Sequence, residues 1–126
     1  REVFTADNYA VMDAYSYDKG TGTAEYYDVF TLNPFMKAYS ERPGTIVSQI
    51  KKHGKRLLEC ETPEYLQDIR VKKLKRIVIL IVPENSGGDV DQAFEKARGE
   101  LGKYDIEVRL VRAYGSYPAA KENAEE

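Results

Sequence analysis

Apolar side chains recur along this chain in two different periods, and the change of period predicts its elements. Residues 9–17 and 23–32 alternate between apolar and polar at every second position, which is typical of β-strands. The intervening residues 18–22 contain two glycines that can take positive φ, so the pair is predicted to be a hairpin. A short helix is expected near residues 35–40, and a second helix over residues 45–53.

Strand and helix patterns continue to alternate in the second half of the chain. Residues 55–61 alternate as a strand, and Thr62-Pro63-Glu64 then predicts the start of a helix that reaches about residue 73. Ile77 to Val82 is apolar on both faces, which predicts a central strand with helices above and below. After it come a helix over residues 89–104, capped by Asp89 and Gln92, and a strand over residues 106–111.

These elements predict one α/β domain over residues 1–117: a mixed sheet of about five strands with an N-terminal antiparallel hairpin and helices packed on its faces. Residues 118–126 carry no sizeable apolar side chain and are expected to form a frayed acidic tail. The longest apolar run, residues 77–82, is far shorter than the ~20 residues that span a bilayer, so no membrane segment is expected.

Composition adds two expectations. Cys60 is the single cysteine and lies in an apolar alternating run, so we expect a buried, inert thiol in an intracellular, cytoplasmic protein. A charged fraction of 32% with few glutamines is typical of proteins from thermophiles.

Charge is distributed unevenly, because residues 51–76 hold nine Lys/Arg against four Asp/Glu in a chain whose net charge is −2. A basic segment of this kind attracts phosphates, although it can equally be a solvated surface. The predicted contacts to DNA or RNA are Lys51, Lys52, Lys55, Arg56 and Lys73.

Three carboxylates form the most specific chemical pattern. Glu59 and Glu61 are two residues apart on a predicted strand and therefore share a face, and Asp28 lies on a strand that could be its neighbour. Carboxylates held together in this way can bind Mg²⁺, which activates water and stabilises the leaving oxygen in phosphodiester cleavage. Asp28 and Glu59 are the predicted metal ligands.

At these residues the chain resembles the restriction-endonuclease-like, or PD-(D/E)XK, nuclease superfamily, in which one strand carries an acid and the next an acid-x-lysine. The resemblance implies a Mg²⁺-dependent nuclease with Asp28, Glu59 and Glu61 at its catalytic site. Glu61 stands where that pattern has lysine, and a Tyr-rich hairpin replaces the usual leading helix. Lys72 on the following helix would then replace the lysine and Gln67 would be a further polar participant, or the fold would bind nucleic acid without cleaving it.

Other interpretations remain open from the residues alone. Glu59 and Glu61 can form the solvent-exposed face of a strand and form ion pairs with nearby lysine or arginine side chains. A noncatalytic homodimer can form through the Tyr-rich hairpin or an exposed sheet edge. A small ligand or nucleotide can bind the Pro83–Asp89 loop. His53, the single histidine, is expected at a helix end, as a cap or in solvent.

Overall fold

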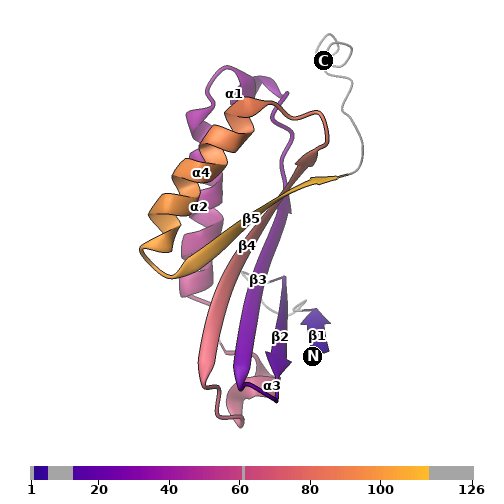
Figure 1. Ribbon diagram of the computed structural model, residues 1–126, viewed down its shortest axis with the longest axis vertical. Helices are drawn as coiled ribbons and strands as arrows, with labels where there is room; N and C mark the ends of the chain where they lie inside the picture. The colour runs from indigo at the N-terminus through magenta and orange to yellow at the C-terminus, as the bar shows by residue number, and fades with distance from the viewer. Residues whose placement is uncertain (1, 6–12, 61, 114–126) are drawn as a thin grey trace.

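In the part of the chain that the structure describes, five strands form one mixed sheet whose spatial order is the order of the chain, β1-β2-β3-β4-β5 (Figure 1). The computed structural model describes residues 2–5, 13–60 and 62–113. The first three strands pair antiparallel, and β3, β4 and β5 pair parallel. The predicted architecture is therefore confirmed. The strands are β1 Glu2–Thr5, β2 Ala14–Asp18, β3 Thr23–Thr31, β4 Lys73–Pro83 and β5 Ile106–Ala113, and the helices are α1 Lys37–Ser40, α2 Gly44–Leu58, α3 Glu64–Gln67 and α4 Gly88–Gly102.

The predicted hairpin is β2 and β3, and Gly22 in its turn has φ +73°, a conformation in which a Cβ would be strained. The Gly22 carbonyl accepts the backbone amide of Lys72 at 2.8 Å, so the turn also fixes the entry into β4. Residues 9–12 of the predicted first strand, and the predicted tail over residues 118–126, lie outside the described residues.

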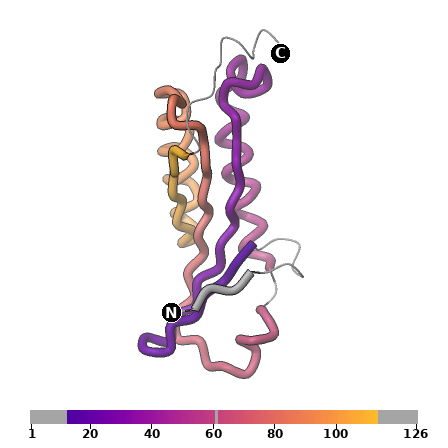
Figure 2. The backbone as a smooth tube through the Cα atoms, turned by 90° about the vertical axis from the view of Figure 1, so that its right-hand side faces the viewer, coloured from indigo at the N-terminus to yellow at the C-terminus, as the bar shows by residue number. Residues whose placement is uncertain are grey.

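Both long helices lie side by side on one face of the sheet (Figures 1 and 2). α2 connects β3 to β4 and α4 connects β4 to β5. Two β-α-β connections that have the same handedness and add their strands in the same direction across the sheet place their helices on the same face of that sheet. The prediction that β4 has helices above and below it is therefore wrong for the described residues, although Ile77 on the other face of β4 is fully buried.

The core lies between this sheet face and the two helices. Alternate side chains of the three parallel strands pack against one apolar stripe of each helix. Separately, no helix among the described residues is long and apolar enough to cross a membrane. The fully buried core side chains include Val78, Leu80, Val82, Ile46, Ile50, Leu57, Val90, Ala97 and Leu101.

The predicted strand over residues 55–61 is wrong as far as the described residues reach, because residues 55–58 are the last turn of α2. The buried positions 46, 50, 54 and 57 keep helical spacing beyond His53. Gly54 therefore does not end the helix. It lies inside α2, where an added Cβ would come within 2.6 Å of Leu101 Cδ1. Its small size permits close contact between α2 and α4.

The helix predicted to reach residue 73 is also wrong, since α3 ends at Gln67 and β4 begins at Lys73. This segment buries Leu66 and few other apolar side chains, too little to hold a longer helix. The predicted cap by Asp89 and Gln92 is absent as well, because α4 follows Gly87 with no capping side-chain bond at its start.

Candidate acid–base site

Two aspartates face α2 from neighbouring positions of the sheet. Asp28 lies in β3, in the row that points toward the helices, and it is only 4% exposed. Asp13 directly precedes β2, and its backbone amide donates to the Tyr27 carbonyl at 2.9 Å. Because the antiparallel register pairs Ala14 with Tyr27, Asp13 comes opposite Asp28 on the same face. Two ionised carboxylates in these positions would repel each other, so the arrangement favours the protonated form of one of them.

His53 of α2 contacts Asp28 directly. Its Nδ1 lies 3.0 and 2.9 Å from the two carboxylate oxygens, and its ring stacks on Phe30 with centroids 3.8 Å apart. The histidine side chain is 19% exposed and the aspartate side chain 5%. An ionised carboxylate can only accept hydrogen bonds, so a neutral His53 in this contact has its ring proton on Nδ1 and its acceptor at Nε2. We call Asp13, Asp28 and His53 the aspartate–histidine site.

Asp13 is held in an environment that favours its protonated form. Burial is the largest cause that raises the pKa of Asp13, and a hydrogen bond from the Val29 amide to Oδ2 at 2.6 Å lowers it. The charge of Asp28 and a side-chain hydrogen bond with it raise this pKa further, while His53 lowers it. The balance leaves the pKa above its ordinary value.

One flank of α2 surrounds the histidine with cationic and polar side chains. Gln49 and Arg56 lie four and three residues from His53, at spacings that make them its neighbours on the helix surface, and Lys52 is in turn three residues from Gln49 and four from Arg56. α2 contains no acidic residue. α2 begins near the carboxyl end of β3. Its basic residues lie in its C-terminal half, and this half of the helix is near the aspartate–histidine site.

The other predicted nucleic-acid contacts are divided between two places. Lys51 forms an ion pair with Glu100 of α4 at 2.6 Å, and Lys55 lines a shallow pocket beside the same carboxylate. Lys73 is the first residue of β4 and is exposed. Three of the five predicted contacts are therefore away from the flank that carries His53.

The predicted carboxylate cluster does not assemble in the described residues. Glu59 is the residue that follows the last turn of α2, six positions beyond His53 and so about 9 Å further along the helix axis. Asp28 is bonded to His53 instead of facing a neighbouring acidic strand. Glu61 lies outside the described residues. The part of the chain that is described contains no group of three or more side chains that could hold a metal ion, and a Mg²⁺ site with Asp28 and Glu59 as its ligands stays a prediction.

Gln67 and Lys72 lie together, but in a separate pocket of about 590 Å³ between α3 and the amino ends of β3 and β4. Tyr26 also lines this pocket, and it is the next residue from Asp28 along the same face of β3. The amide of Gln67 donates to the Thr62 carbonyl at 3.3 Å. The pocket is thus adjacent to the aspartate–histidine site along the sheet.

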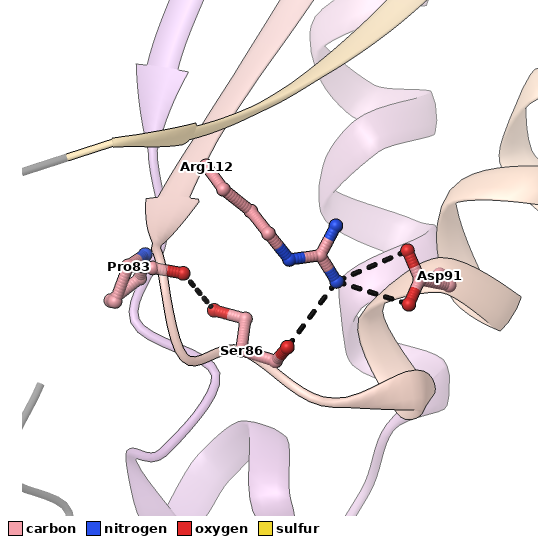
Figure 3. Close-up of polar contacts among 4 residues, drawn as sticks. All are labelled: Pro83, Ser86, Asp91 and Arg112. Carbon is pink, nitrogen blue, oxygen red and sulfur yellow. Dashed lines mark hydrogen bonds and ion pairs between the residues drawn. The ribbon is translucent and has the colours of Figure 1, made fainter. Parts of the chain in front are cut away.

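The Pro83–Asp89 loop is braced by its own polar contacts (Figure 3). The Ser86 hydroxyl donates to the Pro83 carbonyl at 2.7 Å, and Arg112 Nη2 donates to the Ser86 carbonyl and to both Asp91 oxygens. Asp89 and Asp91 place two negative charges in the first turn of α4. A phosphate at this helix start would meet these charges, so the loop does not favour the nucleotide-binding interpretation.

The sheet face opposite the helices carries an apolar strip. Val29 and Val111 are 38% and 40% exposed, and the register places Ile79 and Ile81 between them. We call Val29, Ile79, Ile81 and Val111 the open face. Of the three tyrosines expected on one hairpin face, Tyr15 and Tyr17 lie on the other side and pack against the core, and Tyr9 is outside the described residues. These two tyrosines therefore do not offer the homodimer surface that the sequence suggested.

The sequence pattern indicated Asp28 but predicted His53 at a helix end or in solvent, and that prediction is wrong, because His53 lies inside α2 against the sheet. A usable signal was present. Asp28 stands in an apolar row between Tyr26 and Phe30, and His53 lies between Ile50 and Leu57 of one helix stripe. A polar side chain among core-facing positions on two elements predicts a buried contact between them.

No family model and no curated protein sequence matches the chain. Among solved structures, a chain of the CdiA-CT/CdiI toxin and immunity complex from Yersinia pseudotuberculosis has a similar fold. The TM-score is 0.61 over 88% of this chain and 88% of that chain, with 16% sequence identity. At this identity the likeness is one of fold.

Proposed function

We propose that this chain is the nuclease-like toxin component of a toxin–immunity pair and cleaves phosphodiester bonds at the aspartate–histidine site. The observation that carries the proposal is the contact between buried Asp28 and His53 Nδ1 at 2.9 Å on a helix without acidic residues. The fold likeness to a chain of a toxin and immunity complex supports the assignment to that class of protein.

In this proposal His53 is the general base and Asp28 is a positioning residue. The Asp28 carboxylate fixes the ring through Nδ1, and Phe30 holds its plane by stacking at 3.8 Å. Nε2 then accepts a proton from the attacking nucleophile, and Asp28 stabilises the imidazolium that forms. Lys52 on the same flank of α2 supplies positive charge for the phosphate backbone. No step of this scheme passes through a metal ion.

The test is cleavage of fluorescently labelled nucleic acid, once with Mg²⁺ and once with a chelator. His53→Ala is expected to lose about 10²–10⁴-fold in rate, the range for removal of a general base. Cleavage is expected to persist in the chelator. Glu95→Gln breaks an exposed ion pair with Arg98 far from the site and serves as the matched control.

Two further measurements separate a catalytic role from a structural one. Free imidazole should restore part of the rate to His53→Ala, because the removed ring leaves a space between Asp28 and Phe30. Asp28→Asn should shift the pH profile of the remaining activity. A folded His53→Ala variant that cleaves at the wild-type rate would overturn the proposal, as would activity that depends strictly on Mg²⁺ and on Glu59.

A second candidate function is noncatalytic binding of a protein partner, and the open face favours it. Exposed apolar strips on one sheet face are common at protein interfaces. Sedimentation velocity over a range of concentrations tests self-association through this surface, with Val29→Asp as the disrupting variant. An inactive protein that associates in a Val29-dependent manner would favour this function over cleavage.

A further inference from the structure

Resting on the proposed nuclease function, we infer that the substrate is RNA and that the aspartate–histidine site cleaves it by attack of the ribose 2′-hydroxyl on the neighbouring phosphate.

The inference begins with what the site offers as a base. His53 is the single histidine of the chain, and one of its two ring nitrogens is committed to Asp28. The remaining nitrogen can take one proton from one nucleophile. In the described residues this histidine has carboxylates beside it, and no second imidazole and no cluster of metal ligands that would hold a water molecule for attack.

A nucleophile that belongs to the substrate removes the need for a positioned water. The 2′-hydroxyl of RNA is already adjacent to the phosphorus, and well-oriented intramolecular groups reach effective molarities of about 10⁵–10⁸ M. DNA lacks this hydroxyl, so its cleavage would require the site to bind and orient water as well. The groups present at the aspartate–histidine site are sufficient for RNA.

The step balances with the residues of the site. The 2′-oxygen forms a bond to phosphorus as its proton passes to His53 Nε2, and the bond between phosphorus and the 5′-oxygen breaks. The departing 5′-oxygen takes a proton from the Asp13 carboxyl. The products are a 2′,3′-cyclic phosphate and a 5′-hydroxyl end, and solvent then returns the proton to Asp13 and removes the one on His53.

Asp13 is suited to this second role by its place. Asp13 lies opposite Asp28, and its Oδ2 is oriented by the Val29 amide at 2.6 Å. The residue as a whole is exposed, although its carboxyl group is partly buried. The raised pKa of Asp13, caused first by burial, agrees with a carboxyl that holds a proton to donate.

The experiment uses four oligonucleotides of one sequence: RNA, fully 2′-O-methylated RNA, DNA, and DNA with a single ribonucleotide. Each is incubated with the whole chain in chelator and in Mg²⁺, and the product ends are identified by mass spectrometry. His53→Ala purified in the same way reports any contaminating ribonuclease. The expected result is cleavage of RNA and of the single-ribonucleotide DNA at the ribose, with cyclic phosphate ends, and no cleavage of the other two.

The possible failures are distinguishable. Cleavage of DNA or of methylated RNA at a rate similar to RNA, or ends that carry a 5′-phosphate, would overturn the RNA inference while leaving the nuclease function in place. Cleavage of no substrate, or equal cleavage by His53→Ala, would overturn the proposed function and the inference with it.

The role of Asp13 has its own readout. Asp13→Asn should slow RNA cleavage by about 10²-fold or more, since an amide cannot supply the proton. A substrate in which sulfur replaces the 5′-bridging oxygen has a leaving group that needs no protonation, so it should be cleaved by Asp13→Asn and by wild type at similar rates. Equal slowing on both substrates would show that Asp13 acts through structure alone.

Discussion

Replacing Gly54 by alanine should destabilise the fold, although alanine is the better helix former. Gly54 lies inside α2, where the helix meets α4, and it is buried. An alanine Cβ at this position would lie 2.6 and 2.8 Å from the two terminal carbons of Leu101. Leu101 is itself fully buried, so its side chain cannot move without displacing other core atoms.

The magnitude follows from two opposing contributions. Overpacking a well-packed core costs about 1–3 kcal/mol, and replacing glycine inside a helix stabilises by about 1 kcal/mol. Gly99 of α4 provides a matched control, because it is exposed inside a helix and an added Cβ there has no neighbour within 4 Å. Gly99→Ala should therefore be stabilising by up to about 1 kcal/mol. The difference between the two variants isolates the helix contact at about 1–3 kcal/mol.

Equilibrium unfolding in urea measures both variants, with the midpoint compared at unchanged slope. A double variant adds a second check: Leu101→Ala alone should cost about 2–5 kcal/mol, and combining it with Gly54→Ala should cost less than the sum. If Gly54→Ala stabilises the protein as much as Gly99→Ala does, the close contact between α2 and α4 is refuted.

Three smaller predictions concern ionisable groups elsewhere in the fold. Folding raises the pKa of Asp13 above 3.8, so this group's contribution to stability is full at low pH and is lost as the pH rises through the pKa of the folded state. The urea midpoint of Asp13→Asn should therefore rise relative to that of wild type between pH 3 and pH 7. A difference between the two midpoints that does not change with pH would contradict this prediction. Arg76→Met removes the Nε–H that donates to the Leu57 carbonyl at 3.0 Å near the end of α2, and it should cost about 1 kcal/mol in urea unfolding, whereas no loss would mean that solvent replaces the bond. Arg112→Met loses a partly exposed ion pair with Asp91 and a hydrogen bond to the Ser86 carbonyl, and it should cost about 1–2 kcal/mol, less in high salt, as thermal unfolding at two salt concentrations would show.

The elements that the sequence predicted well are those whose pattern allows one period only. Ile77 to Val82 is too short and too apolar for a surface helix, and it is flanked by charge and by Pro83, so its residues alone are enough to predict β4. The helical spacing of Val90, Ala97 and Leu101 likewise predicts α4. The sheet class follows from the alternation of these elements, because helices between strands imply parallel pairing.

The error at residues 55–60 has a physical cause. Six residues whose apolar members are Leu57, Leu58 and Cys60 fit a period of 2 and a period of 3.6 equally well. What decides for the helix is the contact between Gly54 and Leu101, which are far apart in the chain. The same error concealed the site, since the contact from His53 to Asp28 spans 25 residues and depends on the rotation of α2 about its axis.

The aspartate–histidine site is difficult to explain by stability alone. Removing a carboxylate from water costs several kcal/mol, and an opposing partner recovers this only with good geometry and further hydrogen bonds. Asp28 has His53 as one partner and Asp13 opposite it, and burial together with the charge of Asp28 holds the pKa of Asp13 above its ordinary value, which is an electrostatic cost to the fold. Apolar side chains at positions 28 and 53 would fill the same space between β3 and α2 without this cost. The charged arrangement weakens the core, so it is better explained by the proton that His53 can accept than by the stability of the contact between Asp28 and His53.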